Sequence, residues 1–461
     1  MPELQLICLP LHLLKIPIVT FKDLNLNTPL QNALEEGGFV YPTPIQEKAL
    51  PIILSGKDVV GVAQTGTGKT FAYLLPILKN LKYSEQRQPR VLILVPTREL
   101  VVQVVNEVKK LTTYISSRVA GVYGGTNMNT QKQMVYDGLD ILVATPGRLL
   151  DLSLTGNLRF KSLQTLVIDE VDEMLNLGFR TQLTNILDIL PEKRQNLLFS
   201  ATLTDDVNTI IQSFFNSPEL IEIAATGTPL EMIIQKAYHV PNFYTKVNLL
   251  EHLLQNKDLT KVLLFVDNKK LADRLAEHLQ SKFGEVTGVI HSNKSQNFRL
   301  RSIQNFENGT NRILIATELI ARGIDIQDVT HVINFDTPSI PENYMHRIGR
   351  TGRADKAGTA ITFINEVEQE YQALIEALMK QDIPMEPIPE EVEISDKFTD
   401  EERPNLMDKH YLKLNAHSGK SGFHEKSEKN SKTNQGGSYK RKIKEKYKKP
   451  KTRSAKTKRK Y

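Results

Sequence analysis

The chain has 461 residues, of which 40% are hydrophobic, so it is long and apolar enough for two or three domains and is not disordered throughout. Its single cysteine, Cys8, excludes a disulfide framework and a cysteine-based zinc site within the chain. The net charge of +6 is uneven, because residues 411–461 hold 18 Lys and Arg against three acidic residues. A mildly acidic body with a strongly basic tail is typical of proteins that contact nucleic acid.

Residues 1–20 are apolar but are interrupted by prolines and charged residues. We expect a loose N-terminal extension there rather than a signal peptide or a membrane span. No later segment has an uninterrupted apolar run of about 18 residues. Together with the lone cysteine, this predicts a soluble, cytoplasmic protein.

Short β-rich runs alternate with helical patterns in residues 21–225 and again in residues 226–380. Near-continuous apolar strands separated by helices predict an α/β fold class, with two tandem parallel sheets covered by helices. Residues 381–461 are predicted to be a linker and a disordered Lys-rich tail, because apolar residues become rare there. The predicted strands are 59–62, 91–95, 141–144, 166–168, 197–199, 262–266, 289–290, 313–315, 332–333 and 360–363.

A glycine-rich loop lies between the first predicted strand and the helical run 71–81. Glycines let backbone N–H groups close around phosphate oxygens, while Lys69 reaches the β and γ phosphates and the Thr70 hydroxyl binds magnesium. The strict pattern has glycine where this chain has Ala63. The residues predicted to bind the phosphates are Ala63, Gln64, Thr65, Gly66, Thr67, Gly68, Lys69 and Thr70.

The strand 166–168 ends in the tetrad Asp169-Glu170-Val171-Asp172. Asp169 is placed to hold magnesium through water, and Glu170 to polarise the attacking water as general base. Acidic residues also favour the first turn of a helix. Beside a phosphate loop, however, the acids predict a nucleotide hydrolase.

These motifs resemble those of the DEAD-box RNA helicase family of superfamily 2 over residues 21–365, most like its compact bacterial RhlE-type members. The resemblance implies two RecA-like domains, ATP and Mg2+, and an RNA-stimulated ATPase that unwinds short duplexes or remodels RNA–protein complexes. The segment 38–46 is similar to the family's adenine-reading segment. There Gln46 would hydrogen-bond adenine, whose edge needs both a donor and an acceptor, with Phe21 packed near the base and Thr43 beside it.

Further segments resemble the family's RNA-binding and coupling motifs, which grip phosphates without reading bases. The residues implied to contact RNA are Pro96, Thr97, Arg98, Gly125, Thr145, Gly147, Arg148, Gln296, Arg299, Thr317, Arg322 and Gly323. The residues implied to couple hydrolysis to strand separation are Asp172, Ser200, Thr202, His346 and Arg347.

The second half contains no phosphate loop of its own, but it has an arginine run at 346–353. The resemblance implies that Arg350 and Arg353 reach the γ phosphate as arginine fingers and that Asp325 contacts the ribose. Taken alone, the run would also suit a solvated basic helix. Two residues depart from the family: Val171 replaces Ala without removing a functional group, and Glu318 stands where Asp is frequent, which puts one local contact in doubt.

The basic tail is interpreted as a non-specific RNA tether. A solubilising end and, in a eukaryote, a nuclear-localisation signal would have a similar composition. Two other functions stay open for the whole chain: a DNA-directed superfamily-2 translocase, and an RNA clamp that closes without unwinding. We expect a monomer acting on RNA, with ribosomal or RNA-decay assemblies as its partners.

Overall fold

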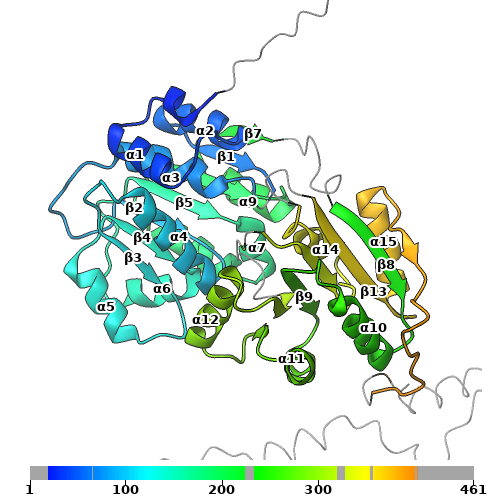
Figure 1. Cartoon of the computed structure of the whole chain (residues 1–461). Helices are drawn as coiled ribbons and strands as arrows, with labels where there is room; N and C mark the ends of the chain where they lie inside the picture. Colours follow the sequence, from blue (N-terminus) through cyan, green and yellow to red (C-terminus); the bar gives the residue numbers. More distant parts are fainter. Residues whose placement is uncertain are drawn as a thin grey trace, which may run out of the picture. The chain divides into compact units, whose positions relative to one another are not determined.

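Two parallel seven-stranded sheets form the framework of the chain (Figure 1). The computed structural model describes residues 19–64, 66–223, 233–318, 326, 328–352, 357–399 and 402. The chain divides into two units, 1–397 and 398–461, and both sheets belong to the first. Residues 1–18 and the basic tail, 411–461, lie outside the described residues, so the predictions for them stay predictions.

The sheet of the first domain has the strand order β3-β4-β2-β5-β6-β1-β7. Every residue of β2 and β4 is buried, as expected where helices cover both faces of a parallel sheet. The strands are β1 (Val59–Val62), β2 (Val91–Leu94), β3 (Val119–Val122), β4 (Ile141–Ala144), β5 (Thr165–Asp169), β6 (Gln195–Ser200) and β7 (Glu219–Glu222).

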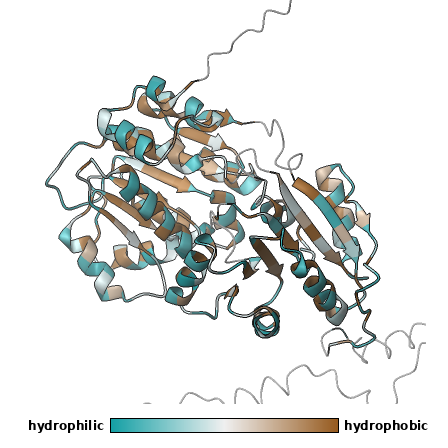
Figure 2. Cartoon of the chain, viewed as in Figure 1, coloured by the Kyte–Doolittle hydropathy of each residue, from teal (hydrophilic) through white to brown (hydrophobic). Residues whose placement is uncertain are grey.

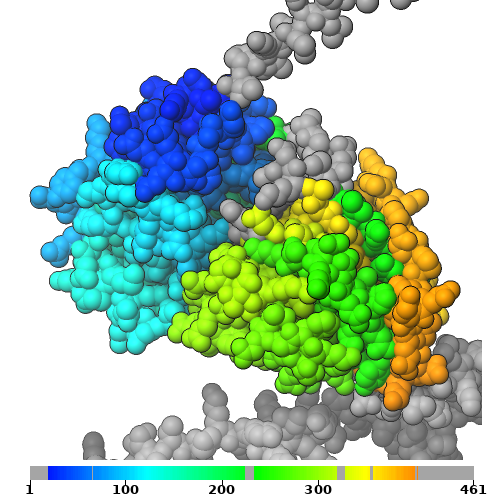
Figure 3. All heavy atoms as spheres, in the orientation of Figure 1, coloured from blue at the N-terminus to red at the C-terminus, as the bar shows by residue number. Residues whose placement is uncertain are grey.

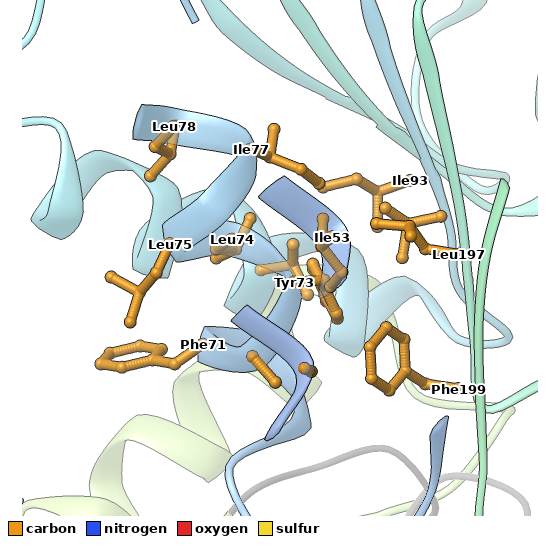
Figure 4. Close-up of a cluster of buried hydrophobic side chains, with 14 of the residues drawn as sticks. Ile53, Phe71, Tyr73, Leu74, Leu75, Ile77, Leu78, Ile93, Leu197 and Phe199 are labelled. Atoms are coloured by element: carbon orange, nitrogen blue, oxygen red, sulfur yellow. The ribbon is translucent and has the colours of Figure 1, made fainter. Parts of the chain in front are cut away.

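Helices pack on both faces of this sheet because alternate strand residues point to opposite sides. Leu197 and Phe199 of β6 belong to one apolar cluster, and Leu198 belongs to the other. Figure 4 shows part of the first cluster, where Tyr73 and Leu74 lie close to Phe199. The helical elements are η1 (Phe21–Leu24), α1 (Thr28–Glu36), α2 (Pro44–Leu54), α3 (Lys69–Asn80), α4 (Arg98–Leu111), α5 (Met128–Asp137), α6 (Pro146–Leu154), α7 (Val171–Asn176), α8 (Arg180–Ile189) and α9 (Asp205–Phe214).

The second domain repeats this architecture, with the strand order β10-β11-β9-β12-β13-β8-β14. Its strands are β8 (Ile233–His239), β9 (Val262–Val266), β10 (Thr287–Ile290), β11 (Ile313–Thr317), β12 (His331–Asn334), β13 (Gly358–Ile364) and β14 (Met385–Glu386). Its helices are α10 (Phe243–Gln255), α11 (Lys269–Phe283), α12 (Gln296–Glu307), α14 (Pro341–Ile348) and α15 (Gln369–Met379). In both domains the strands are largely hydrophobic, and the helices carry hydrophilic residues on their outer sides (Figure 2).

The second domain continues past residue 380, where the sequence predicts a linker. Strand β14 pairs with β8, and Val392 is buried in the core beyond it. The amide of Asn248 donates to the carbonyl of Glu393 at 2.8 Å, which fastens this segment to α10. In the space-filling view it is the orange band beside the green β8 and α10 (Figure 3). The predicted join between the domains, near residue 225, lies outside the described residues.

No helix in the described ranges combines the length and the apolar character needed to cross a bilayer.

Candidate active site and nucleic-acid interface

The phosphate loop connects the end of β1 to the first residue of α3, Lys69. Gly66 and Gly68 have φ angles of 81° and 84°, in the left-handed region that favours glycine. A Cβ atom on Gly68 would lie 2.3 Å from Nε2 of Gln46, so this position has no room for a side chain. The hydroxyl of Thr67 closes the turn by donating to the carbonyl of Gln64 at 2.7 Å. Thr65 lies outside the described residues.

The side chain of Lys69 fits an anionic ligand. It is 6% exposed, and its Nζ has no hydrogen-bond partner among the described residues. A buried ammonium without a partner is costly, and phosphate oxygens at this helix start would satisfy it. Gly68 provides the close backbone approach that such a ligand needs, so the loop fits a nucleotide phosphate chain.

The catalytic acids lie at the carboxyl end of β5, beside the loop. Glu170 has a φ angle of 52°, a left-handed conformation that is rare for a residue with a side chain and that often occurs at functional sites. Asp169 is held at both oxygens: Oδ1 accepts from the backbone N–H of Glu170, and Oδ2 accepts from the hydroxyl of Tyr73, both at 3.0 Å. The Oε2 of Glu170 is buried and accepts no hydrogen bond within the described part of the chain.

Burial is the main cause that raises the pKa of both acids. For Glu170, burial and the charge of Asp169 raise the pKa to about 7, against the opposing charges of Lys69 and Arg350. Burial also raises the pKa of Asp169, and Lys69 is the largest opposing influence. A carboxyl group with a pKa near neutrality is suited to act as a general base.

The donor set also fits magnesium. This ion is usually held by one or two carboxylates, waters and substrate phosphates rather than by an all-protein cage. Asp169 and the hydroxyl of Thr70 are the oxygen ligands that this arrangement requires. In agreement with it, the described residues contain no group of three His, Cys, Asp or Glu side chains that could hold a metal alone.

Gln46 links the adenine-reading segment to the phosphate loop. Its Oε1 accepts from the backbone N–H of Thr43 at 2.9 Å, and its Nε2 donates to the carbonyl of Gly68 at 3.0 Å. An amide oxygen accepts two hydrogen bonds and an NH2 group donates two, so Gln46 keeps one of each for a base. Phe21 is only 5% exposed and packs in the core of the first domain. Its predicted contact with the base stays a prediction.

The predicted coupling residues of the first domain are brought together by Asp172. Its Oδ2 accepts from the backbone N–H groups of Ala201 and Thr202 at 3.1 and 3.0 Å, and from the Thr202 hydroxyl at 3.0 Å. Ser200 closes the same loop by donating its hydroxyl to the carbonyl of Thr202 at 2.7 Å. The tetrad is therefore bonded directly to the end of β6.

The arginine run of the second domain begins within α14 and extends beyond it. His346 places its Nδ1 3.0 Å from Oε1 of Glu173, a first-domain residue that the sequence did not single out. Arg350 is 4% exposed, and its charge lowers the pKa of Glu170. Groups from both domains thus act on the same carboxylate. Arg353 and Asp325 lie outside the described residues.

Arg347 is held inside the second domain. It is 2% exposed, pairs with Glu318, and donates from Nη1 to the carbonyl of Asp336 at 2.7 Å. Its Nη2 lies 3.4 Å from Oδ1 of Asp267. The longer carboxylate of Glu318, in place of the usual Asp, therefore reaches its arginine.

The first-domain residues predicted to bind RNA lie at the carboxyl ends of β2 and β4, which neighbour each other at one edge of the sheet. Thr97 begins α4, where its hydroxyl accepts from Leu100 N–H at 3.3 Å. Arg98 lies against Gly125, where a Cβ atom would be 2.0 Å from its Nη1. Arg148 donates to Oε1 of Gln131 at 2.8 Å. Pro96 lies in the same region, and Thr145 and Gly147 at the start of α6.

In the second domain, the predicted RNA contacts Gln296 and Arg299 face a protein carboxylate. Nη1 of Arg299 and Nε2 of Gln296 each lie 3.0 Å from Oε1 of Glu99, which is on α4 of the first domain. All three side chains are at least nine-tenths buried. Sequence reasoning missed Glu99, and the only hint was an acidic residue in the first turn of α4. Thr317 ends β11, while Arg322 and Gly323 lie outside the described residues.

Two tandem parallel α/β domains, with a phosphate loop and an acid pair in one and an arginine of the other acting on the base, define a two-domain nucleotide hydrolase. Residues 43–210 match the family model of the DEAD/DEAH box helicase, and residues 245–355 match that of the helicase conserved C-terminal domain. The chain is 41% identical over 351 residues to the DEAD-box ATP-dependent RNA helicase CshA of Geobacillus kaustophilus (strain HTA426), covering 76% of this chain and 74% of that protein. It is 39% identical over 363 residues to CshA of Bacillus subtilis (strain 168), covering 79% and 73%.

Solved structures agree with this assignment. The structure of S. cerevisiae Dbp5 bound to RNA and ADP BeF3 has a TM-score of 0.73 and 29% identity, covering 80% of this chain and 95% of that one. DEAD-box helicase Mss116 bound to ssRNA and UDP-BeF has a TM-score of 0.72 and 30% identity, covering 81% of each chain. The chain belongs to the DEAD-box ATP-dependent RNA helicase family. The predicted RecA-like fold and enzyme class are confirmed, and the likeness to RhlE-type members stays a prediction.

Proposed function

We propose that this helicase binds ATP in the phosphate loop, hydrolyses it with Glu170 as the base, and uses the cycle to open short RNA duplexes or remodel RNA–protein complexes. One observation carries the proposal: the pKa of Glu170, in the first domain, responds to the charge of Arg350, in the second. A reaction site that needs both domains can report nucleotide state as a change in their association.

Each residue of the site has a distinct role in this proposal. Lys69 binds the β and γ phosphates, and Thr70 and Asp169 would hold Mg2+, which neutralises phosphate charge when bound. Glu170 accepts the proton of the attacking water, for which its unpartnered Oε2 is available. Arg350, together with Arg353, stabilises the charge that develops on the γ phosphate.

The coupling route begins at two contacts of α7. Asp172 binds the loop that ends β6, and Glu173 lies 3.0 Å from His346 of the second domain. We propose that a change at the acids moves both contacts together, because Asp172 and Glu173 follow Glu170 within the first turn of this helix. ATP and RNA then favour the associated state of the domains, and hydrolysis releases it.

RNA is the proposed partner, bound through its phosphates in single strands and short duplexes. The Dbp5 and Mss116 structures contain RNA and ssRNA, respectively, which supports this choice. Ribosomal and RNA-decay assemblies, a monomeric state and a cytoplasmic location belong to the same proposal. Residues 411–461 would act as a tether. Their deletion should lower the salt dependence of RNA binding by about 0.7 log unit per lost phosphate contact, and an unchanged slope would exclude a tether.

The Glu170→Gln variant tests the central role. RNA-stimulated ATP hydrolysis should fall by about 100-fold or more, while RNA binding in the presence of ATP remains. Glu277→Gln, an exposed site on α11, is the matched control and should hydrolyse ATP normally. Turnover of the E170Q variant at the wild-type rate would contradict the assignment of the base.

Two assays separate the alternatives. Stimulation of the ATPase by DNA as strongly as by RNA would favour the DNA translocase. Tight ATP-dependent binding to RNA without displacement of a short duplex strand would favour the clamp. The buried contact between Arg299 and Glu99, which joins the domains, is the observation that keeps the clamp in consideration.

A further inference from the structure

Tyr73 is a buried polar side chain to which the proposed function gives no role. It lies on α3, one turn after Thr70, and is 0% exposed. Its ring packs against Phe199 with the centroids 5.4 Å apart, within an otherwise apolar cluster (Figure 4). A phenylalanine would fill the same space, so the hydroxyl is the feature that needs an explanation.

That hydroxyl joins the two side chains assigned to magnesium. It donates to Oδ2 of Asp169 at 3.0 Å, and the side chain of Thr70 also interacts with it. Burying a hydroxyl without a hydrogen bond is costly, and here the compensating partners are the proposed metal ligands rather than backbone groups. Tyr73 therefore contacts the metal site from its apolar side.

The direction of these hydrogen bonds follows from chemistry. An ionised carboxylate only accepts, so the phenol proton points to Asp169. The phenol oxygen can then only accept the proton of the Thr70 hydroxyl. Both lone pairs of that hydroxyl oxygen are left facing away from the proton, toward the phosphate loop. The other oxygen of Asp169 is fixed by the backbone N–H of Glu170 at 3.0 Å.

We propose that Tyr73 is a positioning residue of the magnesium site, which orients Thr70 and Asp169 through one hydroxyl before the metal binds. This inference rests on the proposed function, because it assumes that these two side chains serve magnesium. Residues that orient metal ligands typically change metal affinity by about 10–100-fold when they are altered. The expected effect is thus on the energetic coupling between metal and nucleotide rather than on nucleotide binding itself.

The test is the Tyr73→Phe variant in an equilibrium binding assay with a fluorescent ADP analogue. The dissociation constant is measured in excess EDTA and in saturating Mg2+, and the ratio of the two values reports the coupling. In Y73F this ratio should fall by about tenfold, while affinity in EDTA stays unchanged. Tyr344→Phe is the matched control, because Tyr344 is also 0% exposed and donates its hydroxyl to a side chain, Oε1 of Gln235, at 2.9 Å. Y344F should keep the wild-type ratio, and melting temperatures establish that both variants fold.

Asp169→Asn separates failure of this inference from failure of the proposed function. If D169N keeps the wild-type ratio, the assignment of the metal site itself is wrong. If D169N lowers the ratio and Y73F does not, Tyr73 only fills space and satisfies a buried carboxylate. An equal fall in Y73F and Y344F would also overturn the inference, because it would show a general effect of losing a buried hydroxyl. In the double variant, Y73F should add no further loss to that of D169N.

Discussion

The carboxylate of Asp172 and the hydroxyl of Thr202 are hydrogen-bonded at 3.0 Å, which joins the acid tetrad to the loop that follows β6. The same carboxylate oxygen also accepts from two backbone N–H groups of that loop. Three hydrogen bonds to one charged oxygen make this a strong local connection. The hydroxyl is the only one of the three donors that a substitution can remove without changing the backbone.

Thr202→Ala should therefore separate hydrolysis from unwinding. The catalytic acids and the phosphate loop stay intact, so RNA-stimulated ATPase should remain within about threefold of wild type. Strand displacement per ATP should fall by about tenfold, because one charge-assisted hydrogen bond is worth about 1.5–3 kcal/mol. Thr204→Ala is the control, since Thr204 caps α9 and its printed contact is with Val207 rather than Asp172. Equal losses of both activities in T202A would show that the contact serves only the fold.

The raised pKa of Glu170 predicts a pH-dependent stability of the free protein. Because the pKa is about 7 in the folded state and 4.5 ordinarily, the stability that protonation contributes is fully present below about pH 4.5 and is lost as pH rises through about 7. Gln cannot ionise, so E170Q escapes this loss. Its melting temperature should match wild type near pH 5 and exceed it by several degrees above about pH 8. Thermal melts across this range check the prediction; E277Q should show no trend, and a gap independent of pH would contradict it.

Gly125→Ala should weaken RNA binding without touching nucleotide binding. The residue has a φ of 82°, and a Cβ atom there would stand 2.0 Å from Nη1 of Arg98, so the guanidinium must move. We expect RNA affinity to fall by about tenfold, comparable to the loss of one charge-assisted contact. Gly124→Ala is a close control, because its Cβ would lie 3.4 Å from Arg98, an ordinary contact distance. Fluorescence anisotropy with labelled RNA measures both, and equal effects would remove Arg98 from the explanation.

Glu99→Gln tests whether the contact with Arg299 helps to hold the two domains together. Removing one partner of a buried ion pair leaves the other charge uncompensated, which typically costs about 3–5 kcal/mol. RNA affinity should therefore fall in the presence of an ATP analogue, although the substitution removes a negative charge from the RNA-binding side. Glu107→Gln, on the same helix and paired with Lys110, should change little. Tighter RNA binding in E99Q would show that Glu99 merely competes with RNA for Arg299.

The central strands and the phosphate loop could be predicted because their patterns are local. Strands β2 and β4 are continuous apolar runs, and the loop carries its glycines, Lys69 and Thr70 within one short segment. Strands β3 and β7 were missed, since edge strands are partly exposed and lack such a run. The partners of Asp172, Arg299 and Tyr73 could not be predicted, because each contact joins segments far apart in the chain. The resemblance named Gln296 and Arg299, but only the structure shows that they meet Glu99.

Val171 is fully buried and belongs to the same apolar cluster as Met174 and Leu198. Its neighbours in the tetrad are carboxylates that the reaction and its coupling require, whereas its own side chain points into the packing of α7 on the sheet. Two different constraints thus act on four consecutive residues: chemistry fixes the acids, and available volume fixes the third position. A substitution there is compensated by a change in the opposing apolar side chains rather than by any change in the catalytic groups. Position 171 is therefore expected to vary with the size of the residues on α9 and β6, independently of the substrate that the enzyme acts on.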